Sequence, residues 1–161
     1  MSIIYLVIVL NKRMLKNKLT VTLPFVLAIV SMFLGEKFTL DSGWMNSLNK
    51  ALSNRLLFWN INLNQYGIKF FPQNIKTINV LLNDGSFTTN YLDNGYLNFL
   101  IGIGYFQTII LLLILSVAIE RIIIQNKYNE LVIIVILLIY AFTEKVVFFH
   151  QFAVSYFLYA F

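Results

Sequence analysis

Long apolar blocks are the feature of this sequence that most constrains its fold. Residues 19–35 and 96–119 carry no charged side chain, and residues 131–142 form a third apolar block. A helix that crosses a membrane needs roughly 20 mostly apolar residues. The first two blocks therefore predict spanning helices. The third is too short by itself, and it predicts a span if the helix runs from about Tyr128 to about Phe149.

The composition is that of an integral membrane protein. Of the 161 residues, 59% are hydrophobic and only 12% are charged, and the mean hydropathy is +0.76. This apolar share exceeds that of an ordinary soluble domain. The chain has no cysteine and a single histidine, His150, which excludes disulfides and any multi-histidine metal site. We expect no metal and no cofactor. Basic residues do not spread along a soluble face, so nucleic acid is not an expected partner.

The basic residues predict how the chain is oriented. Residues 12–18 carry no acid and contain the basic cluster Lys12, Arg13, Lys16 and Lys18. Such a cluster stays in the cytoplasm, and the connection 120–130 should lie on the same side. Residues 36–94 then form a long extracytoplasmic loop, and long loops between spans are usually functional. We expect one all-α membrane domain, 1–161, with about four transmembrane helices in the cytoplasmic membrane.

Both ends of the chain differ from a full span. Residues 2–10 are apolar but cover less than half the required length, and no basic region precedes them. They look like the second half of a transmembrane helix, which predicts that the chain is part of a longer protein. The last dozen residues are expected to form a short return segment or to lie along the membrane interface.

Residues 43–60 of the outer loop have the periodicity of one amphipathic helix. At about 100° per residue, a single face is apolar. It is made up of Trp44, Leu48, Ala51, Leu52, Leu56 and Trp59. Such a helix is expected to lie on the outer membrane interface. Arg55 falls within this apolar face, where it either snorkels toward the headgroups or binds an anion such as a phosphate.

Asp93 stands where the chain enters the longest apolar block, and two interpretations stay open. Its side chain caps the following helix, or it pairs with Arg55 and acts as a base at the mouth of the bundle. Glu144 is interpreted as an interfacial ion pair with Lys145, and His150 as a packed residue. The sequence contains no Gly-rich phosphate loop and no Ser/His/Asp arrangement.

The chain resembles a known family in three stretches, which follow one another in the family's order: LNKALSNRLLFW, NQYGIKFFPQNI and NYLDNGYLNFLIGIG. They are similar to the C-terminal third of bacterial Wzy-type polysaccharide polymerases, which assemble capsule, exopolysaccharide and O-antigen. The resemblance covers about residues 45–149. On this mapping the family's motif residues fall on Arg55, Gln73, Asp93, Asn94, Tyr96, Leu97, Thr143 and Glu144.

The sequence departs from the family pattern in two residues and in length. Asn54 and Pro72 stand where the family usually has glycine, and both limit the backbone freedom of the loop. Polymerases of this family usually have ten or more spans, and about four are expected here. The shortfall agrees with the half-length first segment.

The resemblance implies a role in polymerising lipid-linked repeat units. The family transfers a growing glycan from undecaprenyl diphosphate to the sugar of another lipid-linked unit, on the outer face of the cytoplasmic membrane. It implies that Asp93 is catalytic and that the substrate-binding residues are Arg55, Gln73, Asn94, Tyr96 and Glu144. The expected partners are an undecaprenyl-diphosphate-linked oligosaccharide, the lipid bilayer and other polysaccharide-assembly membrane proteins. The alternative is a small non-catalytic membrane subunit that binds a partner, and the composition fits it equally well.

Overall fold

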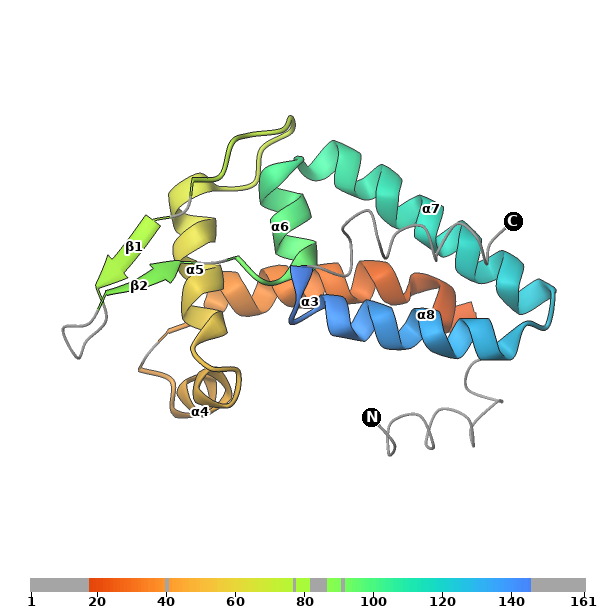
Figure 1. The fold of residues 1–161 in the computed structure, drawn as a ribbon, viewed down its shortest axis with the longest axis horizontal. Helices are drawn as coiled ribbons and strands as arrows, with labels where there is room; N and C mark the ends of the chain where they lie inside the picture. Colours follow the sequence, from red (N-terminus) through yellow and green to blue (C-terminus); the bar gives the residue numbers. More distant parts are fainter. Residues whose placement is uncertain (1–17, 40, 77, 82–86, 91, 146–161) are drawn as a thin grey trace.

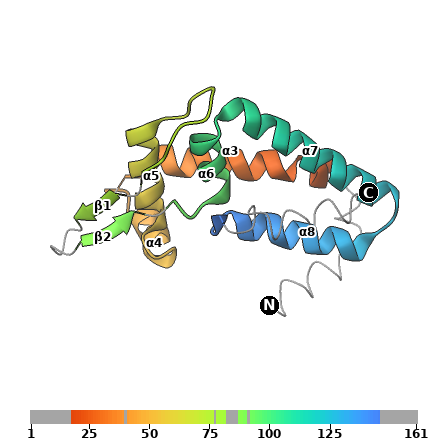
Figure 2. The same ribbon diagram turned by 45° about the horizontal axis from the view of Figure 1, so that its top comes forward.

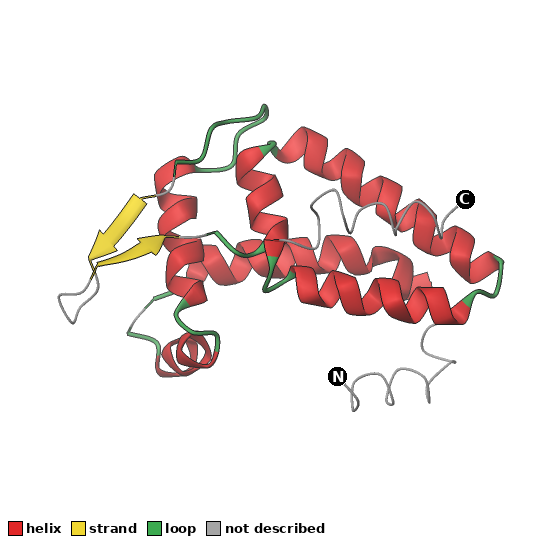
Figure 3. Cartoon of the chain, in the orientation of Figure 1, coloured by secondary structure: helices red, strands yellow, loops and turns green. Residues whose placement is uncertain are grey.

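The computed structural model describes residues 18–39, 41–76, 78–81, 87–90 and 92–145 of the chain (Figure 1). Its elements, in chain order, are η1 Lys18–Thr22, α3 Leu23–Lys37, α4 Gly43–Ala51, α5 Arg55–Tyr66, β1 Ile78–Leu81, β2 Phe87–Asn90, α6 Gly95–Gly102, α7 Tyr105–Ile124 and α8 Tyr128–Ala141. The fold is helical, as expected, with one short antiparallel hairpin in which Ile78 pairs with Asn90 and Leu81 with Phe87 (Figure 3). The predictions for residues 1–10, for Lys12, Arg13 and Lys16, for His150 and for the final segment lie outside the described residues.

Within the described part of the chain, two helices are long and apolar enough to cross a membrane. They are Leu19–Lys37, which joins η1 to α3, and Tyr105–Ile124, which is α7. α8 is apolar but has only 14 residues. The two long helices expose a row of large apolar side chains: Val26, Ile29, Val30 and Phe33 on α3, and Phe106, Ile109, Ile110, Leu113, Ile114 and Val117 on α7. A surface of this kind is suited to lipid.

The predicted span 96–119 is two helices. α6 ends at Gly102, and α7 begins at Tyr105 and runs to Ile124. The break occurs at Gly104, whose φ of +86° lies outside the range of a helix and is readily adopted only by glycine. The predicted helix boundaries were therefore wrong, although the longest apolar block does contain a candidate span.

The predicted helix from Tyr128 to Phe149 ends early, at Ala141. The backbone amides of Thr143 and Glu144 both donate to Tyr140 O, which closes a turn in place of another helical turn. The next carbonyls, those of Phe142 and Thr143, accept hydrogen bonds from side chains of other elements. Tertiary contacts therefore end the helix, and Glu144 lies just beyond it.

The amphipathic helix predicted over 43–60 is interrupted. Ser53 and Asn54 have positive φ values, +53° and +65°, and this left-handed turn separates α4 from α5. The turn gives α5 a different direction from α4 (Figure 1). Trp59 is completely buried, whereas Trp44 on α4 is 60% exposed. A single apolar face across both helices was therefore a wrong prediction.

Among the described residues, the core consists of two apolar clusters that share α3. One lies between α3, α7 and α8, and the other lies where the end of α3 meets α4, α5 and α6. In Figures 1 and 2 the start of α3 and the α7–α8 turn lie at one end of the molecule, and α4, α5 and the hairpin lie at the other. The end of α8 and the start of α6 meet between the two clusters.

Candidate functional site

A partly buried ion pair connects α5 to the segment after α8. Arg55, the first residue of α5, donates from Nη2 to Glu144 Oε1 at 2.7 Å and from Nη1 to the carbonyl of Thr143. The side chains of Arg55 and Glu144 are 26% and 27% exposed. The pair is thus partly shielded from solvent.

Two asparagines stabilise the turn between α4 and α5, directly before Arg55. Asn49, which is buried, donates to Asn54 Oδ1 at 3.1 Å and accepts from the backbone amide of Leu57 at 3.1 Å. Asn54 itself takes the left-handed conformation, which asparagine tolerates better than other residues with a side chain. Position 54 is therefore one at which glycine or asparagine fits the backbone.

Asp93 lies within electrostatic reach of this ion pair and outside the two candidate spans. Burial raises the pKa of Asp93 above its ordinary value of 3.8, and the nearby charge of Glu144 raises it further. Arg55 and Lys145 act in the opposite direction, but burial is the strongest influence and the pKa remains raised. Four charged groups from three separate parts of the chain therefore form one cluster, which we call the charged cluster: Arg55, Asp93, Glu144 and Lys145.

Asn94, and not Asp93, caps α6. Its Oδ1 accepts from the backbone amide of Leu97 at 2.9 Å, as expected of an N-cap residue. Its Nδ2 donates to Ser31 Oγ at 3.0 Å and to Phe142 O at 2.9 Å, which ties α6 to α3 and to the end of α8. The interpretation of Asp93 as the cap was therefore wrong. Asn94 is fully buried, and these bonds give it a structural role behind the charged cluster.

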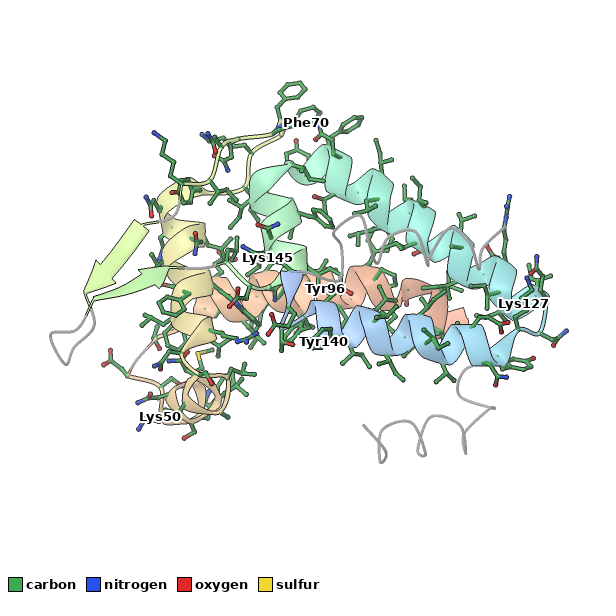
Figure 4. The ribbon with its side chains drawn as sticks, viewed as in Figure 1. Lys50, Phe70, Tyr96, Lys127, Tyr140 and Lys145 are labelled. Atoms are coloured by element: carbon green, nitrogen blue, oxygen red, sulfur yellow. The ribbon has the colours of Figure 1, made fainter. Side chains whose placement is uncertain are left out.

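The side chains of Tyr96 and Gln73 donate hydrogen bonds to backbone carbonyls. Tyr96 is completely buried, and its hydroxyl donates to Leu138 O at 2.9 Å (Figure 4). Gln73 lies near the other end of α6, where its Nε2 donates to Ile101 O at 2.9 Å and to Gly67 O at 3.0 Å. Of the six residues to which the resemblance gives a role, Arg55 and Glu144 form an ion pair and both influence the pKa of Asp93. Asn94 and Tyr96 are buried, and Gln73 bonds near the far end of α6.

Trp59 is a neighbour of the site that the sequence pattern assigned to the membrane interface. Its ring packs edge-on against Phe142, with ring centroids 5.3 Å apart. Its indole Nε1 is buried and has no hydrogen-bond partner within the described part of the chain. Trp59 follows Arg55 by one helical turn, and this i, i+4 spacing was the sequence signal that both side chains share a face of α5.

The site has no metal-ligand grouping within the residues that the structure describes. No protein-family model, curated protein or solved structure matches the chain.

Proposed function

We propose that the chain takes part in polymerising lipid-linked oligosaccharide repeat units, as the Wzy-type polymerases that it resembles do, and that the charged cluster binds the diphosphate of the lipid carrier. One observation carries the proposal. Arg55, Asp93 and Glu144 lie far apart in the sequence and all three match family motif positions, yet Arg55 and Glu144 form a partly exposed ion pair, and Asp93 is close enough for both charges to influence its pKa.

Arg55 is the group that would hold the diphosphate. A guanidinium has five N–H donors in a planar fork that suits two-point contact with phosphate oxygens. The bonds to Glu144 and to Thr143 O use two of these donors and fix the direction of the fork. Glu144 is then the residue that orients Arg55, and the exposed side of the pair is where the ligand binds.

Asp93 is the proposed general base. In the transfer, a hydroxyl oxygen of the acceptor sugar forms a bond to the anomeric carbon of the donor glycan. The bond from that carbon to the diphosphate oxygen breaks, undecaprenyl diphosphate leaves, and the hydroxyl proton passes to the Asp93 carboxylate. A carboxylate with a raised pKa is a stronger base than an ordinary aspartate, which favours this step. Arg55 stabilises the negative charge that develops on the leaving group.

The membrane setting of the proposal rests on α3 and α7. Their exposed apolar side chains would face lipid, and α4, α5 and the hairpin would lie on the extracytoplasmic side. The charged cluster would then lie near the outer end of the bundle, at the depth of a lipid-linked diphosphate. This gives a multi-pass protein of the bacterial cytoplasmic membrane.

The alternative is a non-catalytic membrane subunit. The observation in its favour is that Arg55 already has a complete carboxylate partner in Glu144, so the pair also serves as a structural bond between α5 and the end of α8. On this alternative, replacing Asp93 would leave any polymerisation unchanged.

A reconstituted transfer assay separates the two functions. The protein is placed in liposomes with an undecaprenyl-diphosphate-linked oligosaccharide repeat, and glycan length is read on a gel. We expect chain extension by the wild type and its loss, by roughly 100-fold or more, in Asp93→Asn, because general-base catalysis typically contributes that much. Lys50→Gln, at an exposed lysine of α4, is the control and should extend normally. Equal extension by Asp93→Asn and wild type would favour the non-catalytic alternative.

A further inference from the structure

Four aromatic side chains gather on the outside of the molecule, away from the charged cluster. They are Phe70, Phe71, Tyr105 and Phe106, which we call the aromatic cluster, and each is between 41% and 66% exposed. Phe70 is at its centre, with ring centroids 4.8 Å from Phe71, 4.9 Å from Tyr105 and 5.2 Å from Phe106. Figure 4 shows Phe70 at the outer edge, where the loop after α5 reaches the start of α7.

The loop that carries Phe70 and Phe71 is firmly attached to the corner between α6 and α7. The backbone amide of Tyr105 donates to Lys69 O at 2.9 Å, and that of Gln73 donates to Gly102 O at 2.9 Å. The side-chain amide of Gln73 adds its bond to Ile101 O. The loop backbone also lies so close to Gly104 that a Cβ there would be 2.5 Å from Phe70 O. The aromatic cluster is therefore held in place before any partner arrives.

The aromatic cluster is continuous with the apolar outer face of α7. Tyr105 and Phe106 begin the helix, and the exposed face continues along it through Ile109, Ile110, Leu113, Ile114 and Val117. Exposed aromatics at the end of an apolar helix are the arrangement found at membrane–water interfaces, where a ring can contact both acyl chains and headgroups. Residues 67–76 also contain two lysines and no acid, and lysine side chains at a membrane interface can place their ammonium groups among the headgroups.

We propose that the aromatic cluster anchors the outer loop in the phospholipid interface, with the rings at the boundary between headgroups and acyl chains. The continuity with α7 points to lipid in preference to a glycan or a second protein, because the same face would already be in lipid a turn further on. The inference rests on α7 crossing a membrane, which the proposed function also assumes. Through Gln73 and Gly104, the anchor fixes the depth of α6 and hence of the Asp93 region that precedes it.

Spin labelling tests the anchor directly, because the chain has no cysteine of its own. Single cysteines at Phe71, at Leu113 on the exposed face of α7 and at Gln65, an exposed polar residue of α5, are each labelled with a nitroxide in phospholipid vesicles. Collisions with oxygen, which concentrates in lipid, and with a water-soluble nickel chelate then report the depth of each label.

The expected order of depth is Leu113, then Phe71, then Gln65. Phe71→Cys should give an oxygen-to-nickel collision ratio several-fold above that of Gln65→Cys and below that of Leu113→Cys. A ratio at Phe71 equal to that at Gln65, with Leu113 in lipid, would overturn the anchor and leave the span intact. A Phe71 label that neither reagent reaches would mean that protein covers the cluster, which also overturns it. A water-exposed label at Leu113 would remove the span and the anchor together.

Discussion

Asp93 has the clearest electrostatic signature among the described residues of the site. Its carboxylate is partly removed from water, and two neighbours of opposite sign do not fully compensate. Such a group destabilises the folded chain when it is charged, because desolvation disfavours the ionised form. Ionisable groups whose pKa is shifted by burial and by specific charged neighbours are often found at functional sites.

The raised pKa of Asp93 predicts a pH dependence of stability. The contribution of Asp93 is fully present below its unfolded-state pKa of 3.8 and is lost as the pH rises through the higher folded-state pKa. Asp93→Asn should not show this loss. We therefore expect the thermal unfolding midpoint of Asp93→Asn, relative to wild type in detergent, to increase as the pH is raised from about 3 to about 7. Asp41→Asn, at an exposed aspartate, controls for the removal of a negative charge. A difference that stays constant with pH would refute the raised pKa.

Single residues were predicted from the sequence only where a local pattern marks them. Arg55 was found because it interrupts an apolar face, and Asp93 because it stands at the edge of an apolar block. The bond from Arg55 to Glu144 could not be predicted from the residues alone, since no local periodicity links positions that are far apart in the chain. The sequence did not show that Asn94, in place of Asp93, is the N-cap of α6, because the two residues are adjacent and both residue types are good N-caps.

Among the elements, the corner between α6 and α7 depends most on a single residue. Gly104 has φ +86° and ψ +161°, a combination essentially restricted to glycine. The carbonyl of Phe70 occupies the space that a side chain would need. This corner turns the predicted continuous helix into a short helix that leads from the charged cluster and a long one that is a candidate span.

Gly104→Ala should therefore destabilise the protein strongly. Backbone strain at such a position costs about 1–3 kcal/mol, and the clash with the loop backbone adds to it. We expect a lower thermal unfolding midpoint and a lower yield of folded protein. Gly43→Ala is the matched control, since nothing lies within 4 Å of a Cβ at Gly43. If both variants unfold at the same temperature as wild type, the corner is not held as described.

The existence of the apolar helices was predictable from the sequence, and their ends were not. Blocks of apolar residues mark α3, α7 and α8 by composition and length. The end of α8 depends on carbonyls that Arg55 and Asn94 take up, and the break between α4 and α5 depends on two consecutive left-handed residues without glycine. The first is a tertiary effect, and the second has no strong sequence signal.

At the scale of the whole molecule, the elements gather at two opposite ends (Figure 1). The start of α3 and the α7–α8 turn, which contains Lys127, lie at one end (Figures 1 and 4). The sequence predicts that residues 12–18 and 120–130 share a side of the membrane, and of the first stretch the structure describes only Lys18, at the start of η1. That this side is cytoplasmic is a prediction from the basic residues. The charged cluster lies where α3, α5, α6 and α8 come together, so its geometry depends on the complete helical arrangement.

Binding of an isoprenyl diphosphate tests the central proposal, that Arg55 belongs to a diphosphate site. The affinity for farnesyl diphosphate is measured in nanodiscs for wild type, for Arg55→Lys and for the control Lys50→Gln. Lysine keeps the charge opposite Glu144 but cannot make the two-point contact. We expect Arg55→Lys to bind about 10-fold or more weakly, the equivalent of about 1.4 kcal/mol, with an unfolding midpoint close to that of wild type and of Lys50→Gln. Equal affinities in all three proteins, or no binding by the wild type, would contradict the account and leave Arg55 and Glu144 as a structural ion pair.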